Sequence, residues 1–203
     1  MAAEFENWIW WGVPEHGIER AQLDYDTYIG KQYPVLTVKR VPDGALGCPV
    51  FVTSSSSSKF ENRRCPPVSN GIVIDKTFVE IILSFENKEF VQFYPIKIKA
   101  GGIYVNDYFF IFVNTHVNCI DYQSMGEEKI VYFDENPIVM EARQFKHLKG
   151  CLGGRHIARE CLHPSHLIVS NDLKNALVAT GEPLDFRQPE QVAWPPLLCR
   201  PLG

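Results

Sequence analysis

Long hydrophobic runs are absent from this sequence of 203 residues, and so is a recognisable secretory signal. No apolar stretch approaches the roughly 20 residues that a membrane-spanning helix needs. The first residues, MAAEFENWIWWGVPEH, include Glu4 and Glu6, have no Lys or Arg before Arg20, and lack a sustained apolar segment. We therefore expect a cytoplasmic protein without a membrane partner.

An excess of positive charge is also lacking. The chain has 20 Lys and Arg against 24 Asp and Glu, which gives a net charge of -4 and a pI near 5.9. Binding to phosphates needs a clustered excess of Lys and Arg, so a nucleic-acid partner is excluded. The composition, 45% hydrophobic and 22% charged, is that of an ordinary globular protein with one sizeable core. A macromolecular partner would more naturally be a basic protein.

Familiar catalytic motifs are missing. The sequence contains no GxSxG, GxxxxGK[ST], GxGxxG or HExxH, and it lacks the HxE and PCxxC pair of zinc deaminases. A nucleophilic alternative would use Cys119 or Cys161 with a nearby histidine, and Asp121 to orient it. Nothing in the sequence fixes that geometry. We expect a protein that is not an enzyme and that needs no cofactor.

Close cysteine pairs are absent as well, since no CxxC occurs. In a chain of this size and expected compartment, widely spaced cysteines favour reduced, buried thiols over a disulfide framework. The six cysteines are Cys48, Cys65, Cys119, Cys151, Cys161 and Cys199.

One group of possible metal ligands remains, because thiolates and imidazoles suit zinc. Its spacing, C-x4-H-x4-C-x-H-x2-H, departs from the close pairs of structural zinc sites. We therefore interpret the segment as a loop opened by Gly150, Gly153 and Gly154, and keep a metal- or thiol-dependent hydrolase using residues 147–166 as the alternative. The group consists of Cys151, His156, Cys161, His163 and His166.

What the chain does have is a dense aromatic and β-branched stretch over residues 90–121. Ile96 and Ile98 alternate with charged Lys97 and Lys99, the period of a half-buried strand. We predict strands over 90–99 and 103–113, joined at Gly101-Gly102. Pro95 cannot donate a ladder hydrogen bond, which places it at an edge or a bulge.

The first third of the chain is acidic and rich in tryptophan. Residues 1–30 have six acidic residues and one arginine. Trp8, Trp10 and Trp11 form an exposed surface in one interpretation, but the favoured one is a strand whose Trp8 and Trp10 pack on the core. Further strands are predicted at 35–41 and 47–52, a flexible serine loop or linker at 54–58, and an irregular segment at 65–71.

Two segments of the chain have similar sequences, an internal similarity that we call the echo. IVIDKTFVEIIL (72–83) and LIVSNDLKNALV (167–178) align without a gap. Each has three apolar residues, then an N-cap residue, Asp75 or Ser170, then a helical pattern. The echo predicts two strand-to-helix units, with helices near 75–86 and 171–179, the second stopped by Gly181. Chance similarity of two amphipathic helices is the competing interpretation.

Charge is segregated in the second half. Residues 121–141 have six acidic residues and one lysine, a net charge of -5, whereas residues 143–174 have a net charge of +4. A solvated face is one interpretation, and a surface that steers a basic partner is the other. Residues 192–203 contain three prolines, which predicts either an extended segment packed against the core or a disordered terminus.

The order of these pieces resembles the immunity protein 11 family of bacterial polymorphic toxin systems. The likeness covers residues 65–190 and rests on IVIDKTFVEIIL, FYPIKI, YFFIFVN, CIDYQS and HLIVSNDLKNALVATGEPLDF. It implies a cytoplasmic protein, not an enzyme, that binds and neutralises a toxin to protect the producing cell. It also implies structural roles for the motif residues Pro95, Asn114, Asp121, Ser124, Gly181 and Phe186.

Together these observations predict an α+β fold with a central, mainly antiparallel sheet flanked by a few helices. Residues 1–64 are expected as an N-terminal part or small subdomain, 65–190 as the core and 191–203 as a tail. The expected partner is a cognate toxin with a basic surface, bound by the acidic 121–141 segment or by the acidic N-terminal third. The proposed contact residues are Asp121, Tyr122, Glu127, Glu128, Asp134 and Glu135.

Overall fold

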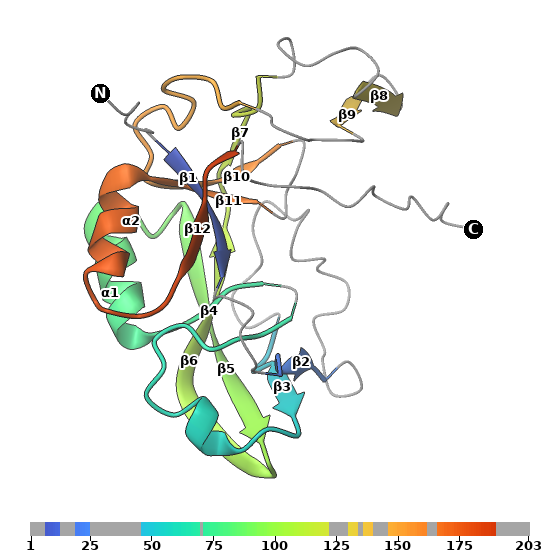
Figure 1. The fold of residues 1–203 in the computed structure, drawn as a ribbon, viewed down its shortest axis with the longest axis vertical. Coiled ribbons are helices and arrows are strands. Elements are labelled where there is room, and N and C mark those ends of the chain that lie inside the picture. The colour runs from blue at the N-terminus through green and yellow to red at the C-terminus, as the bar shows by residue number, and fades with distance from the viewer. Residues whose placement is uncertain are drawn as a thin grey trace.

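The computed structural model describes residues 7–12, 19–24, 46–69, 71–121, 130–133, 136–139, 146–161 and 166–189. These residues form two α-helices and two mixed sheets of five strands each (Figure 1). The α+β class is therefore confirmed, with two sheets in place of the single expected one. The predicted strand at 35–41 and the tail at 191–203 lie outside the described residues.

The first sheet has the order β12-β1-β11-β10-β7. It combines the start of the chain with its last third, since β1 pairs antiparallel with both β11 and β12. Only the β10–β7 pair among its described strands is parallel. The strands are β1 (Asn7–Gly12), β7 (His116–Val117), β10 (Ile157–Glu160), β11 (Leu167–Ser170) and β12 (Asp185–Arg187).

The second sheet has the order β2-β3-β5-β6-β4. Its β3–β5 pair is parallel and its other described pairs are antiparallel, so both sheets are mainly antiparallel as predicted. The strands are β2 (Gln22–Leu23), β3 (Val50–Thr53), β4 (Val73–Asp75), β5 (Val91–Ala100) and β6 (Ile103–Val113). The strand expected at 47–52 thus begins and ends later.

The β5–β6 hairpin confirms the central prediction. Its two-residue loop has φ of +54° at Gly101 and +86° at Gly102, a backbone shape that glycine adopts without steric cost. Pro95 lies beside the predicted irregularity, because the register shifts between Ile96 and Ile98. Opposite this shift, Asp107 in β6 has φ of +67°, as a bulge residue.

The two strand-to-helix units are also confirmed. α1 (Lys76–Phe85) follows β4, and Asp75 Oδ1 accepts a hydrogen bond from Phe78 N at 2.9 Å. α2 (Asn171–Val178) follows β11, and Ser170 Oγ accepts one from Leu173 N at 3.2 Å. Each cap satisfies one orphan donor of the first turn. The helices lie side by side against the sheets (Figure 1).

The core has two parts that meet at β6, whose side chains alternate between them. Ile111 and Val113 face a cluster with both helices and Trp10, while Phe110 and Phe112 face a cluster with Phe51, β3 and β5. Burial on both faces explains why β6 is almost continuously apolar in its second half.

The first tryptophans belong to this core. Trp10 is 2% exposed and stacks near Phe186 of β12 with ring centroids 5.7 Å apart. Trp8 packs at the edge of the same cluster, donates a hydrogen bond to Asn171 and lies under the ammonium group of Lys174 at 3.3 Å. The interpretation of Trp8 and Trp10 as core residues is confirmed.

The serine run forms a loop whose hydroxyl groups contact another segment of the chain. Ser54 Oγ donates to Glu19 Oε2 at 2.7 Å, and the 3₁₀ helix η1 (Ser57–Lys59) follows. The next residue, Phe60, is fully buried, and its carbonyl accepts a hydrogen bond from the Tyr108 hydroxyl. Contacts with Glu19 and Tyr108 from other segments thus position a serine-rich loop that has no apolar side chains to bury.

The segment after β7 contains a separate two-stranded sheet. β8 (Ile130–Phe133) pairs antiparallel with β9 (Asn136–Val139), and Figure 1 shows the pair apart from the two larger sheets. Neither described helix has the length and apolar character needed to cross a lipid bilayer.

Candidate functional site

The two ends of the acidic segment meet at one place. Ile120 forms an isolated antiparallel bridge with His147, and Leu148 N donates to the Cys119 carbonyl at 2.6 Å. Asp121 N donates to the Lys146 carbonyl at 2.8 Å. Residues 121–146 are therefore an excursion with both ends joined, which we call the acidic excursion.

Asp121 is the one proposed contact residue that the structure describes. It is partly buried at the base of the acidic excursion. The other proposed contacts lie outside the described residues, and their role stays a prediction. They are Tyr122, Glu127, Glu128, Asp134 and Glu135.

A disulfide between Cys119 and Cys151 ties the base of the acidic excursion to the glycine-rich loop that follows it. The two Cα atoms are 5.0 Å apart, within the range that a disulfide spans. The expectation of reduced, buried thiols is therefore wrong for this pair. Cys48 and Cys161 lie outside the disulfide, as expected, but are exposed, and the expectation holds for Cys65, whose burial raises the pKa of its thiol. Cys199 lies outside the described residues.

The metal-ligand group considered in the sequence is not assembled by the fold. Cys151 is bonded to Cys119, and His156 Nδ1 lies 2.9 Å from Ser170 Oγ. Cys161 is exposed, whereas His166, the residue before β11, is 1% exposed. His163 lies outside the described residues. Close spacing along the chain did not bring these residues together, because the extended strand β10 lies between His156 and Cys161 and separates them.

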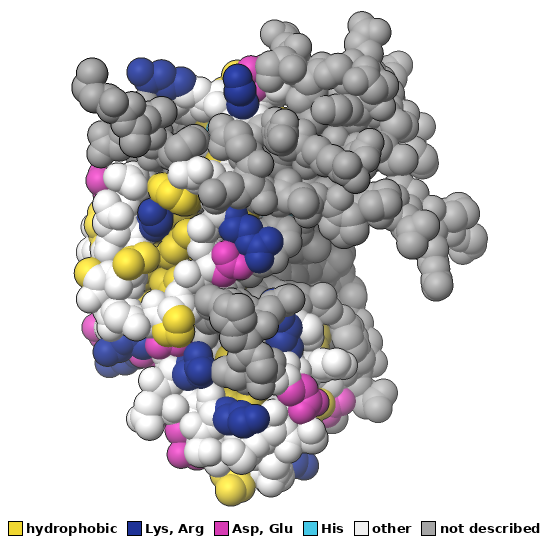
Figure 2. Space-filling view, in the orientation of Figure 1, with side chains coloured by type: hydrophobic (Ala, Val, Ile, Leu, Met, Phe, Trp, Pro, Cys, Tyr) yellow, Lys and Arg dark blue, Asp and Glu magenta, His cyan; other side chains and the backbone are white. Residues whose placement is uncertain are grey.

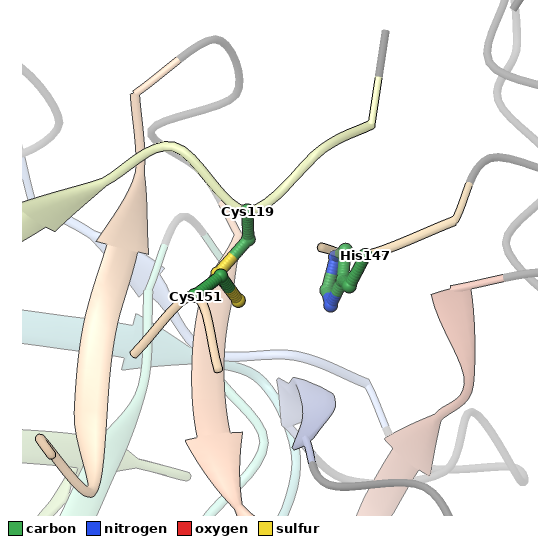
Figure 3. A group of neighbouring side chains, drawn as sticks. All are labelled: Cys119, His147 and Cys151. Carbon is green, nitrogen blue, oxygen red and sulfur yellow. A yellow bond between two sulfur atoms is a disulfide. The ribbon is translucent and has the colours of Figure 1, made fainter. Parts of the chain in front are cut away.

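A different group does come together. Among the residues that the structure describes, Cys119, His147 and Cys151 form the one set of three or more possible metal ligands, with ligand atoms within 4.8 Å of one another. Figure 3 shows the His147 ring beside the two sulfur atoms. The five-residue ligand group named from the sequence left out His147, although the range 147–166 begins there and the four-residue spacing from Cys151 was a usable signal.

Asn7 of β1 links two members of this group. Its Nδ2 lies 3.6 Å from Cys151 Sγ as a donor, and its Oδ1 contacts His147 Nδ1. An amide oxygen only accepts hydrogen bonds, so Nδ1 of His147 carries the proton and Nε2 keeps its lone pair. Burial lowers the pKa of His147 from 6.5 to about 4, which keeps the imidazole neutral at pH 7.

A second set of contacts anchors the glycine-rich loop to α1. Glu86, the C-cap of α1, is 7% exposed and accepts hydrogen bonds from Arg155 at 3.3 Å and from His156 N at 3.0 Å. The Arg155 guanidinium lies 3.4 Å above the Phe90 ring. The loop is thus held at both ends, by the disulfide and by this carboxylate.

Cys119, the first candidate nucleophile, is bonded in the disulfide. Cys119 Sγ is bonded to Cys151, so it presents no thiolate in this state. Cys119 N donates to Glu160 Oε2 at 2.7 Å, which gives this buried carboxylate a structural contact at the same place. Cys161 is exposed and lies outside the disulfide, but no described trio of ligand-type side chains includes it.

A shallow groove of about 490 Å³ lies between the hairpin loop and β3. Glu19 and Lys99 line it with opposite charges, and the hydrogen bond from Ser54 lowers the pKa of Glu19. On the described surface in Figure 2, acidic and basic side chains are likewise interspersed.

No protein-family model matches this chain, and no curated protein matches it.

Proposed function

We propose that this protein is an immunity protein, which binds a cognate bacterial toxin in the cytoplasm of the producing cell and neutralises it. The observation that carries the proposal is the acidic excursion, whose residues 121–141 have a net charge of -5 and whose two ends are joined by the Ile120–His147 bridge. An acidic segment whose ends are joined to the scaffold can dock on a basic protein surface through complementary charge.

The described motif residues of the resemblance support this proposal, because they contact the scaffold, whereas Ser124 lies outside the described residues. Pro95 lies by the β5 irregularity, and Asn114 caps the chain after β6 with a hydrogen bond from Nδ2 to the Glu89 carbonyl. Gly181 has φ of +80° just after α2, and Phe186 stacks near Trp10. Such residues maintain a fold and leave the surface that recognises a toxin to vary.

Binding through the acidic excursion would occlude the toxin's active site in a one-to-one complex. Complementary charge raises the association rate and selects against wrong partners more than it raises affinity. The toxin contact surface would therefore be rich in Lys and Arg.

Co-expression rescue tests the proposal. The gene beside that of this protein is examined for a large secreted product with a toxic C-terminal domain, and that domain is expressed alone or with this protein. We expect growth arrest alone and recovery on co-expression, with a one-to-one complex on gel filtration. A complex that forms without rescue would point to an adaptor, and neither binding nor rescue would reject the immunity function.

A further inference from the structure

We propose that Cys119, Cys151 and His147 form a Zn²⁺ site when the disulfide between the two cysteines is reduced. Zinc favours thiolate sulfur and imidazole nitrogen in tetrahedral geometry, with Zn–S near 2.3 Å and Zn–N near 2.0 Å. All three side chains already converge, with their ligand atoms within 4.8 Å of one another (Figure 3).

The backbone around the site is fixed by contacts that do not involve the sulfur atoms. The isolated Ile120–His147 bridge and the hydrogen bond from Leu148 N to the Cys119 carbonyl hold Cys119 and His147 close together. Cys151 follows in the same turn, where its N donates to the Leu148 carbonyl at 3.3 Å. Loss of the disulfide therefore leaves the three side chains together.

Small side-chain rotations suffice to admit the ion. Two thiolates on a tetrahedral zinc lie about 3.8 Å apart, which follows from the usual Zn–S length. The Cα atoms of Cys119 and Cys151 are 5.0 Å apart, so this sulfur separation needs no large movement of the backbone. His147 and Cys151 also have the four-residue spacing that is common between the second pair of ligands in zinc sites.

Asn7 orients the histidine ligand. Its side-chain oxygen contacts His147 Nδ1, so Nε2 is the nitrogen that binds the metal. Its amide nitrogen donates toward Cys151 Sγ, a contact that also stabilises a thiolate. Asn7 is therefore a positioning residue, with water as the fourth ligand of the zinc ion.

The chemistry balances with a thiol reductant. A dithiol transfers two electrons and two protons to the Cys119–Cys151 bond and becomes a disulfide itself, which leaves two protein thiols. Zinc binding then releases the two thiol protons to solvent, and two thiolates neutralise the dication. In a reducing compartment the two cysteines would bind zinc, and in an oxidising compartment they would form the disulfide. The glycine-rich loop would therefore be cross-linked to Cys119 in both compartments.

Cobalt titration tests the site. Full-length protein is reduced with a phosphine, desalted under anaerobic conditions and titrated with Co²⁺, whose thiolate charge-transfer and tetrahedral d–d absorption bands report the ligands. We expect both bands to saturate at one equivalent and to disappear when Zn²⁺ is added. No such bands in the reduced protein, or equal bands in the oxidised protein, would overturn the proposal.

Variants assign the ligands. C119S, C151S and H147Q should lose the one-equivalent binding, and N7A should weaken it by about 10-fold to 100-fold, as outer contacts to metal ligands do. The matched control is the double variant Cys48→Ser with Cys161→Ser, which removes the two exposed thiols and should bind as the unmodified protein does. Loss of metal binding in the Cys48→Ser and Cys161→Ser double variant would contradict the assignment. If a cysteine variant fails to fold, H147Q still distinguishes binding at the proposed site from binding at the exposed thiols.

Discussion

Glu86 shows how a single buried carboxylate joins two parts of the chain. It ends α1, and its two oxygens accept hydrogen bonds from the Arg155 side chain and from His156 N. When a buried acceptor is removed, its donors have lost their hydrogen bonds to water and gain none in the protein, which costs free energy of folding.

Glu86→Ala should therefore destabilise the protein by about 2 kcal/mol, because a buried donor and a partly buried guanidinium lose their partner. Denaturant unfolding measures the change. Glu89→Ala is the matched control, since Glu89 is exposed near the same helix end and should cost less than about 0.5 kcal/mol. Equal losses in the two variants would show that the Glu86 contacts add nothing.

His147 gives the oxidised protein a pH-dependent stability. Burial lowers its pKa from 6.5 to about 4, so the unfolded chain binds a proton in this interval and the folded chain does not. Stability from this group is fully present above pH 6.5 and is lost as the pH falls toward 4. The loss amounts to at most about 3 kcal/mol, since the residue is only partly shielded from water.

The measurement is the free energy of unfolding of oxidised, metal-free protein between pH 4 and 7, for the unmodified chain and for His147→Gln. The difference between the two curves should change by this amount, in favour of the variant at low pH. Parallel curves would mean that His147 titrates as an exposed histidine does.

The elements of this fold differ in how far the sequence predicts them. The β5–β6 hairpin and the two strand-to-helix units were predicted because their signals are local: Gly101-Gly102, alternation along β5, and capping residues before amphipathic helices. The pairing of β1 with β11 and β12 was not predicted, because register between distant strands depends on packing across the whole core.

The two helix caps permit a matched test. Asp75→Ala and Ser170→Ala should each destabilise the protein by about 1 kcal/mol, since each removes the acceptor for a first-turn N–H. Asp75→Asn and Ser170→Thr retain a capping oxygen and should recover most of that loss in thermal or denaturant unfolding. If the alanine and the conservative variants lose equal stability, the caps are not what stabilises these helices.

At the scale of the whole molecule, a two-sheet scaffold holds an acidic excursion at a cross-linked base. The charge of the excursion could be read from the sequence, because it depends only on composition. Its closed base could not, since Cys119 and Cys151 are 32 residues apart and the bridge at His147 exists only in the folded chain. The disulfide was missed because sparse cysteines gave no pairing pattern.

The most direct test of the account is the association rate of this protein with its cognate toxin domain, measured over a range of salt concentrations. Reversal of Glu127, Glu128, Asp134 and Glu135 to Lys should slow association at low salt by about 10-fold or more and flatten its salt dependence. The control reverses four exposed acidic residues of the scaffold, with the same change in charge, and should have a clearly smaller effect. These residues are Glu61, Glu80, Glu89 and Asp172.

If the acidic excursion is the docking surface, charge reversal in the excursion will slow association and flatten its salt dependence, and charge reversal in the scaffold will not. Unchanged kinetics in that variant, or equal slowing in the control, would contradict the central claim that this segment recognises the toxin.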